Sequence, residues 1–403
     1  MDSPRNKPKR KKQPPQNPIE AAIRTWFHTS ALAQHQQWDL DELIAHAPKR
    51  WTVYEPMVLL PAGSFHPATW KQLLSDLSDE QVDLLWAQIL VEISKKSGGT
   101  HLTHLAVNEG IPAALRHSPG ENAVGDNSAP ENILRSPTGL HILHGDFGPA
   151  PDDITPDFEH AFWVSTRQNG VFQTWAPRWT MFSRGNIKEK ARLLGFHDGR
   201  PMEDRKPLQD TWAVDLYAGI GYFTFSYAKL GMRVLCWELN PWSVEGLRRG
   251  ARGNGWSVRV VKDEHDLALP MDELVSGGEQ IIVFLEDNRH AARRIKELSE
   301  LDISHVNCGL LPTSHASWKD AWNIAGRSKR REVWLHLHEN VGVADIEKRK
   351  GDIEQYFLGI APDDNDNANR TARIEHTELV KTFAPGVWHC VFDLHITRSS
   401  SIT

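Results

Sequence analysis

A glycine turn between two acidic residues is the stretch of this sequence whose spacing best suits a ligand site. Gly219 and Gly221 follow an apolar run of strand length that ends in Asp215, and the next apolar run ends in Glu238. Such a turn lets a ligand approach the backbone closely, while the second acid can accept the hydroxyls of a ribose. The dinucleotide fingerprint has a third glycine where this chain has Thr224. The pattern therefore favours S-adenosylmethionine over NAD.

Polar residues also close two later strands of the same region. Residues 281–285 form an apolar run that leads into Asp287 and Asn288, and a further apolar run is broken at Pro312 and Thr313. In a doubly wound sheet, ligands bind at the carboxyl ends of the strands. We therefore expect these strand ends to share a crevice with the glycine turn. Asp287 and the backbone near Asn288 would meet the edge of an adenine.

A polar turn and a short helix precede the glycine motif. Ser183 lies in the turn, and the helix is expected from Ile187 until Gly195 stops it. Ser183 can cap this helix, and the residue types alone favour that interpretation. Alternatively, its hydroxyl and the free N–H groups of the helix start face a polar or anionic ligand, with Lys190 one turn further on.

Strands that alternate with helices, followed by two strands of alternating polarity, predict a doubly wound α/β domain with an antiparallel edge. A smaller α+β region precedes this domain. Asn169-Gly170 between two apolar runs indicates a β-hairpin. The expected divisions are a disordered basic arm at 1–18, an α-rich region at 19–117, a linker at 118–132, a β-rich middle domain at 133–205 and the doubly wound domain at 206–403.

The amino-acid composition limits the classes of protein to which this chain can belong. Of the 403 residues, 40% are hydrophobic and 24% are charged, which indicates a sizeable folded core. No apolar stretch approaches the roughly 20 residues of a membrane span. Three isolated cysteines and histidines without ligand spacing lead us to expect no metal site and a reducing compartment. Residues 1–12 carry six basic residues against one acid, which suits either phosphate contact or a solvated or nuclear-import tail.

Six motifs occur in a specific order from the middle of the chain to its end. They occupy residues 178–190, 215–224, 238–241, 309–314, 336–341 and 380–393. Together they resemble the tRNA wybutosine-synthesizing aminocarboxypropyltransferases, over roughly residues 160–400. Related tRNA guanine-N1 methyltransferases carry an Asn-Pro-Pro-Tyr-like motif where this chain has Leu311-Pro312-Thr313-Ser314. This difference favours the aminocarboxypropyl branch.

The resemblance implies a Rossmann-like transferase that uses S-adenosylmethionine as aminocarboxypropyl donor. The implied substrate is tRNA-Phe that carries 4-demethylwyosine on the 3′ side of its anticodon. The group joins a ring carbon of this base, and methylthioadenosine leaves. The resemblance also favours a cofactor contact over a helix cap for Ser183. With the glycine turn included, the expected cofactor-binding residues are Ser183, Lys190, Asp215, Gly219, Gly221, Glu238, Asp287 and Asn288.

Other parts of the function stay open at this point. Arg178, Arg184 and His338 are candidates for contacts with the RNA or the substrate base, and no catalytic base can be identified. Two alternative functions are a tRNA guanine-N1 methyltransferase and a non-catalytic RNA-binding protein on the same fold. We further expect a monomer in the cytoplasm, with no membrane or metal partner.

Overall fold

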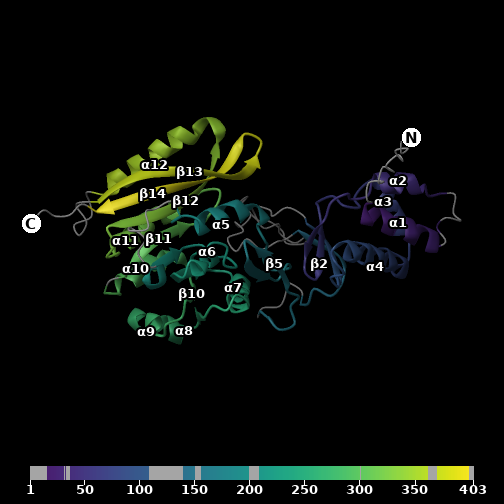
Figure 1. Cartoon of the computed structure of the whole chain (residues 1–403). Helices are drawn as coiled ribbons and strands as arrows, with labels where there is room; N and C mark the ends of the chain where they lie inside the picture. Colours follow the sequence, from purple (N-terminus) through teal and green to yellow (C-terminus); the bar gives the residue numbers. More distant parts are fainter. Residues whose placement is uncertain are drawn as a thin grey trace, which may run out of the picture. The chain divides into compact units, whose positions relative to one another are not determined.

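The contacts of the chain divide it into two units, shown in the computed structural model of Figure 1. Unit 1 comprises Met1–Ala129 and Pro137–Gly148, and unit 2 comprises Pro130–Ser136 and Pro149–Thr403. The expected linker at 118–132, and all but the last residues of the expected basic arm, lie outside the described residues. The structure describes residues 16–30, 32, 37–108, 139–149, 156–198, 208–299, 301–361 and 370–398.

The described part of unit 1 combines four helices with a small mixed sheet. Helix α4 starts at a capping box formed by Ser78 and Gln81, and it packs along α1. The indole of Trp26 donates to the carbonyl of Gln81 at 2.9 Å, which fixes the two helices together. The sheet has the order β1-β2-β3-β4. The elements are α1 (Pro18–Thr29), α2 (Leu40–Ala45), β1 (Thr52–Tyr54), β2 (Met57–Leu60), α3 (Ala68–Asp76), α4 (Asp79–Lys96), β3 (His104–Asn108) and β4 (Leu140–His144).

Unit 2 is built on an eight-stranded sheet with the order β13-β14-β12-β11-β7-β8-β10-β9. The six strands from β9 to β12 pair in parallel, and β14 and β13 add an antiparallel edge. The expected doubly wound α/β fold with an antiparallel edge is therefore confirmed. The strands are β7 (Trp212–Asp215), β8 (Arg233–Glu238), β9 (Val258–Val261), β10 (Ile281–Leu285), β11 (Ile303–Cys308), β12 (Glu332–Gly342), β13 (Arg370–Ala384) and β14 (Val387–Arg398).

Helices cover both faces of this sheet. Neighbouring residues of a strand point to opposite faces, so Ala213 joins one core layer and Val214 the other. The first layer packs against α5 (Ile187–Leu194), α6 (Thr224–Lys229) and α7 (Pro241–Gly253). The second packs against α9 (Met271–Ser276), α10 (Ala291–Lys296), α11 (Trp318–Gly326) and α12 (Ile346–Ile360). Burial on both faces explains why the parallel strands are continuous apolar runs. No helix among the described residues has the length and apolar character needed to cross a membrane.

The separate middle domain expected at 133–205 is not a unit of its own. Strand β4 pairs with β3 in unit 1, whereas the hairpin of β5 (Val164–Gln168) and β6 (Val171–Trp175) packs on α7 in unit 2. Asn254 fixes the hairpin, because its side chain accepts from the Phe172 N–H at 2.8 Å and donates to the Phe172 carbonyl at 2.7 Å. A two-stranded hairpin cannot bury a core by itself, so it uses a neighbouring helix.

A buried ionic network fastens α5 to the antiparallel edge. The guanidinium of Arg192 donates to Glu189 at 2.8 and 2.7 Å and to Asp393 at 3.0 Å. Both carboxylates are almost inaccessible to solvent. Burial alone would raise the pKa of Asp393, but His336 and Arg192 outweigh burial and lower this pKa. The network keeps the segment before the glycine motif in place against β14.

Arg192→Ala should lower the free energy of unfolding by about 3–5 kcal/mol, because it leaves two buried carboxylates without their cation. Urea denaturation of the full chain measures this change. Arg373→Ala is the matched control, since Arg373 pairs with Glu375 on the surface and is 73% exposed. Its loss should cost about 1 kcal/mol at most. Equal costs for the two variants would show that the buried network does not stabilise the fold.

Candidate cofactor site

The turn between β7 and α6 requires glycine at two positions. Gly219 has φ +54° and Gly221 has φ +91°, which is the left-handed region that side chains disfavour. A Cβ atom at position 221 would also lie 2.5 Å from the ring of Phe225. The expected close-approach turn is therefore present at the carboxyl end of β7. The turn can pack this closely against Tyr222 and Phe225 only because these two residues lack side chains.

Asp215 shapes this turn from inside the protein. Its carboxylate accepts from the side-chain amide of Asn307 at 3.0 Å, the Tyr217 N–H at 3.3 Å, and the Thr224 N–H and hydroxyl at 3.1 and 2.8 Å. Asp215 is fully buried, and burial raises its pKa while these hydrogen bonds oppose the increase. A carboxylate with four donors and no exposed surface does not contact a cofactor. The expectation for Asp215 is corrected accordingly: it is a structural residue of the turn.

Glu238 closes the other side of the turn. One carboxylate oxygen accepts from the Gly219 N–H at 2.8 Å, and the other accepts from the Asn240 N–H at 2.8 Å. Burial raises the pKa of Glu238, and the backbone N–H groups of Asn240, Gly219 and Leu239 oppose this rise. A carboxylate offers about four acceptor positions, so it can accept a further hydrogen bond. This arrangement suits the expected ribose contact, which stays a prediction.

Asp287 and Asn288 follow β10 and reach back to the glycine turn. The side-chain amide of Asn288 donates to the Leu216 carbonyl at 2.8 Å, which fastens the end of β10 to the end of β7. Asp287 pairs with the exposed Arg289 at 2.8 Å, and this hydrogen-bonded partner lowers the pKa of Asp287. The backbone after Asn288 is thus held beside the turn. This position suits the expected adenine contact.

Ser183 is tied to the glycine turn through Tyr222. The Ser183 N–H donates to the Tyr222 hydroxyl at 3.0 Å, and that hydroxyl donates to the Met181 carbonyl at 2.5 Å. The Ser183 hydroxyl donates to Asn186 at 3.3 Å and accepts from the Lys381 ammonium at 3.1 Å. It makes no capping hydrogen bond to the helix. The cap interpretation is therefore wrong.

Lys190 places a buried amine behind Tyr222. The residue is 4% exposed, and its Nζ lies 5.2 Å from the centre of the Tyr222 ring. Nζ donates to the side-chain carbonyls of Gln168 at 3.0 Å and Gln173 at 2.7 Å. Burial lowers the pKa of Lys190 to about 7, and no carboxylate opposes it. An anion bound beside this amine would favour its charged form and raise its pKa.

The three candidate RNA contacts lie in different surroundings. Arg184 is exposed beside Ser183, whereas Arg178 is half-buried and donates to the Pro149 carbonyl at 3.2 Å. His338 is buried on β12, where its Nδ1 lies 2.9 Å from Nε2 of His389. Burial lowers the pKa of His338 well below its usual value. The structure therefore does not gather the three into one surface: Arg184 is exposed, Arg178 is partly accessible and His338 is buried.

Sequence reasoning missed two residues that position the turn. Tyr222 joins the turn to the preceding segment, and Asn307 joins β11 to Asp215. Asn307 had a visible signal, because it is a polar residue inside the apolar run of β11. Tyr222 had none, since its hydroxyl meets a segment 39 residues earlier in the chain.

The fold and the site together define a class of protein: a Rossmann-like S-adenosylmethionine-dependent transferase. Solved structures share this fold. P. horikoshii TYW2 in complex with MeSAdo aligns with TM-score 0.55 and 16% identity, over 94% of this chain and 100% of that chain. Trm5b from Pyrococcus abyssi aligns with TM-score 0.50 and 12% identity, over 90% of this chain and 80% of that chain.

Two fungal relatives identify the family. The tRNA wybutosine-synthesizing protein 2 of Schizosaccharomyces pombe is 39% identical over 350 residues, which cover 86% of this chain and 72% of the relative. Its namesake from Saccharomyces cerevisiae is 33% identical over 429 residues, which cover 95% and 81%. The chain matches no protein-family model. On this identity and coverage, the chain belongs to the tRNA wybutosine-synthesizing protein 2 family.

Glu238→Ala should weaken the binding of S-adenosylmethionine by about 1.5–3 kcal/mol, which is roughly ten- to a hundredfold in Kd. The variant removes the expected ribose acceptor and also leaves the Gly219 N–H without its partner. Isothermal titration calorimetry measures the Kd. Glu273→Ala on the exposed face of α9 serves as the control and should leave the Kd unchanged. An unchanged Kd for Glu238→Ala would exclude the ribose contact.

Proposed function

We propose that this protein transfers the 3-amino-3-carboxypropyl group of S-adenosylmethionine to a ring carbon of 4-demethylwyosine in tRNA-Phe. Aminocarboxypropyl transfer from this cofactor in wybutosine synthesis is the activity of the family to which the chain belongs. Our proposal for this chain adds the particular nucleoside, the particular tRNA and the roles of the residues. The observation that carries it is the glycine turn closed by Glu238 in a chain of this family.

Five residues around the turn are proposed to hold the cofactor. Glu238 would accept the ribose hydroxyls, and Asp287 with the backbone at Asn288 would meet the adenine. Ser183 and Lys190 would contact the amino-acid end, because both reach the turn through Tyr222. Their hydrogen bonds within the protein fix these positions before any ligand arrives. Such preorganisation reduces the cost of orienting the reacting groups.

The chemistry of the bound cofactor is that of a sulfonium, whose three adjacent carbons are all electrophilic. The protein decides the product by orientation, since the reacting atoms must approach within about 3–3.5 Å in line. A covalent protein nucleophile is not needed. The buried Ser314 hydroxyl, in the loop after β11, accepts from the Trp318 indole at 2.9 Å and donates to Glu339 at 3.3 Å, and we assign it a structural role in this loop.

The carbon that is transferred can be tested directly with labelled cofactor. Purified protein incubated with tRNA that carries the precursor should incorporate label from carboxyl-labelled S-adenosylmethionine and none from methyl-labelled S-adenosylmethionine. The second candidate, a methyltransferase on the Trm5b-like fold, predicts the reverse. Mass spectrometry of the nucleoside product then identifies the modified base. Incorporation of the methyl label alone would overturn the proposal.

Lys190 should make cofactor binding depend on pH. Because the pKa of Lys190 in the free protein is about 7, the amine is mostly neutral above pH 7 and must take up a proton to pair with the cofactor carboxylate. Affinity should fall by up to about tenfold per pH unit above pH 7, until the pKa of the bound state is reached. Calorimetry in two buffers of different ionisation enthalpy measures the proton uptake.

Two variants separate Lys190 from other titrating groups. Lys190→Met should abolish both the proton uptake and the fall in affinity. Lys229→Met replaces an exposed lysine of α6 and should leave both intact. A Kd for the wild-type protein that is constant between pH 7 and 9 would refute the contact between Lys190 and the cofactor.

A further inference from the structure

Two lysines from distant parts of the sequence approach the segment that contains Ser183. Lys190 of α5 comes from the helix side, and its Nζ lies 4.9 Å from the centre of the Phe182 ring. Lys381 of β13 comes from the antiparallel edge of the sheet, and its Nζ donates to the Ser183 hydroxyl at 3.1 Å. The cofactor contacts proposed above include Lys190 and leave Lys381 without a role.

The local fold holds Lys381 in this position. Strand β13 packs against the short 3₁₀ helix Arg184–Asn186, which directly follows Ser183. Gly185 in this helix leaves room for the lysine, because a Cβ atom there would overlap with the Cδ of Lys381 and lie 3.0 Å from its Nζ. The side chain of Lys381 therefore lies along the segment that precedes the glycine motif.

The ammonium of Lys381 lacks a compensating charge. The residue is half-buried, burial lowers its pKa, and no carboxylate among the described residues opposes this decrease. An ammonium has three N–H donors, and the Ser183 hydroxyl accepts from one of them. Lys190 is in a similar condition, because its acceptors are two neutral side-chain carbonyls. Two cations that are desolvated without a carboxylate favour the binding of an anion between them and Ser183.

A nearby lysine shows that attachment of β13 to α5 does not explain Lys381. Lys188 of α5 pairs with Glu378 of β13 at 2.6 Å and donates to the Leu379 carbonyl at 3.1 Å. Its side chain is 61% exposed, as expected for a surface ion pair. Lys188 therefore connects the two elements at the surface. Lys381 lies three residues after Glu378, closer to the glycine turn, and makes no such pair.

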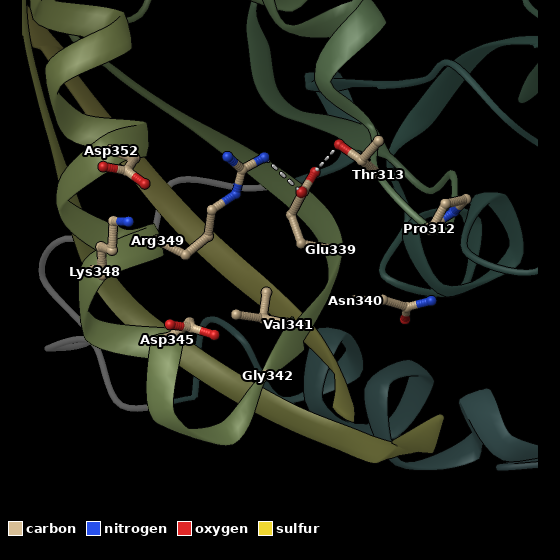
Figure 2. Close-up of a pocket in the computed structure, with 10 residues that line it drawn as sticks. All are labelled: Pro312, Thr313, Glu339, Asn340, Val341, Gly342, Asp345, Lys348, Arg349 and Asp352. Atoms are coloured by element: carbon tan, nitrogen blue, oxygen red, sulfur yellow. Dashed lines mark hydrogen bonds and ion pairs between the residues drawn. The ribbon is translucent and has the colours of Figure 1, made fainter. Parts of the chain in front are cut away.

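The cavity of about 430 Å³ at the carboxyl ends of β11 and β12 is less suited to an anion (Figure 2). Its acids Glu339, Asp345 and Asp352 outnumber its cations Lys348 and Arg349. Arg349 moreover pairs with Glu339 at 2.7 Å, which Figure 2 shows as a dashed line. Of these two places at the same edge of the sheet, the surroundings of Ser183 are the better anion site.

We propose that Lys381 binds the carboxylate of S-adenosylmethionine together with Ser183 and Lys190. The inference rests on the proposed function, which places the amino-acid end of the cofactor at Ser183 and Lys190. A carboxylate offers about four acceptor positions, so it can accept from both ammonium groups. Contacts from two sides restrict the rotation of the aminocarboxypropyl arm, whose carbon must meet the target base in line. The antiparallel edge of the sheet thereby contributes a residue to the cofactor site.

Decarboxylated S-adenosylmethionine is the probe for this contact, because it lacks the carboxylate and keeps the adenosine, the sulfonium and the amine. Isothermal titration calorimetry of the full chain gives the Kd of each ligand. Lys381→Met should raise the Kd for S-adenosylmethionine roughly tenfold, as for loss of a charge-assisted hydrogen bond. It should not raise the Kd for the decarboxylated ligand. Lys188→Met, at the exposed lysine of the same region, is the matched control and should leave both Kd values unchanged.

A second variant and a tRNA measurement complete the test. Lys381→Gln keeps an N–H donor without the charge, and it should give the same result as Lys381→Met. Filter binding should show tRNA affinity close to that of wild type for both variants, because the proposed ligand is the cofactor carboxylate and not an RNA phosphate. Melting temperatures near that of wild type would show that both variants are folded.

Three results would overturn the proposal. Equal increases in the Kd of both ligands would show that Lys381 supports the shape of the site without contacting the carboxylate. Unchanged Kd values for both ligands would place Lys381 outside the site. Unchanged cofactor binding with weakened tRNA binding would assign Lys381 to an RNA phosphate. Failure of the proposed function is distinguishable, since it would appear as no carboxyl-label transfer by wild type, whereas calorimetry requires no turnover.

Discussion

The hydrogen bonds around the buried carboxylate of Asp215 are the constraint on which the rest of unit 2 depends. They join three elements, because Asn307 comes from β11, Tyr217 from the turn and Thr224 from the start of α6. A buried carboxylate is tolerated only when its acceptor positions are filled. The turn is therefore held in one shape. The backbone at Gly219 consequently meets Glu238 at the adjacent strand end.

The other candidate site residues are connected to this turn through hydrogen bonds from both sides. Tyr222 connects it to Ser183, and Ser183 in turn meets Lys381 on the antiparallel edge of the sheet. On the other side, Asn288 connects the end of β10 to Leu216. The segment before the glycine motif is thus tied to the turn, and the buried Arg192 network holds it there. In the proposed site, the flanking segments would therefore set the orientation of the cofactor together with the nucleoside-binding core.

Local patterns in the sequence were sufficient for the turn, the hairpin and the sheet. The glycines, Glu238 and Asn169-Gly170 are signals carried by adjacent residues, and the structure places each as expected. The role of Asp215 was not predictable in the same way, because its partner Asn307 lies 92 residues away. The division at 133–205 failed for a similar reason. A short strand can pair with the sheet of one unit or pack on a helix of the other. The choice depends on residues far away in the sequence, so local sequence patterns do not predict it.

Thr224 has an evolutionary consequence. A glycine at this position would complete the dinucleotide fingerprint, so a single substitution separates this sequence from the pattern typical of NAD sites. In this protein the same substitution would remove a hydroxyl that donates to the buried Asp215 at 2.8 Å. The carboxylate would remain buried with one donor fewer, which destabilises the turn that any nucleotide must approach. In this protein, a change toward the NAD fingerprint is therefore opposed by the stability of the fold itself.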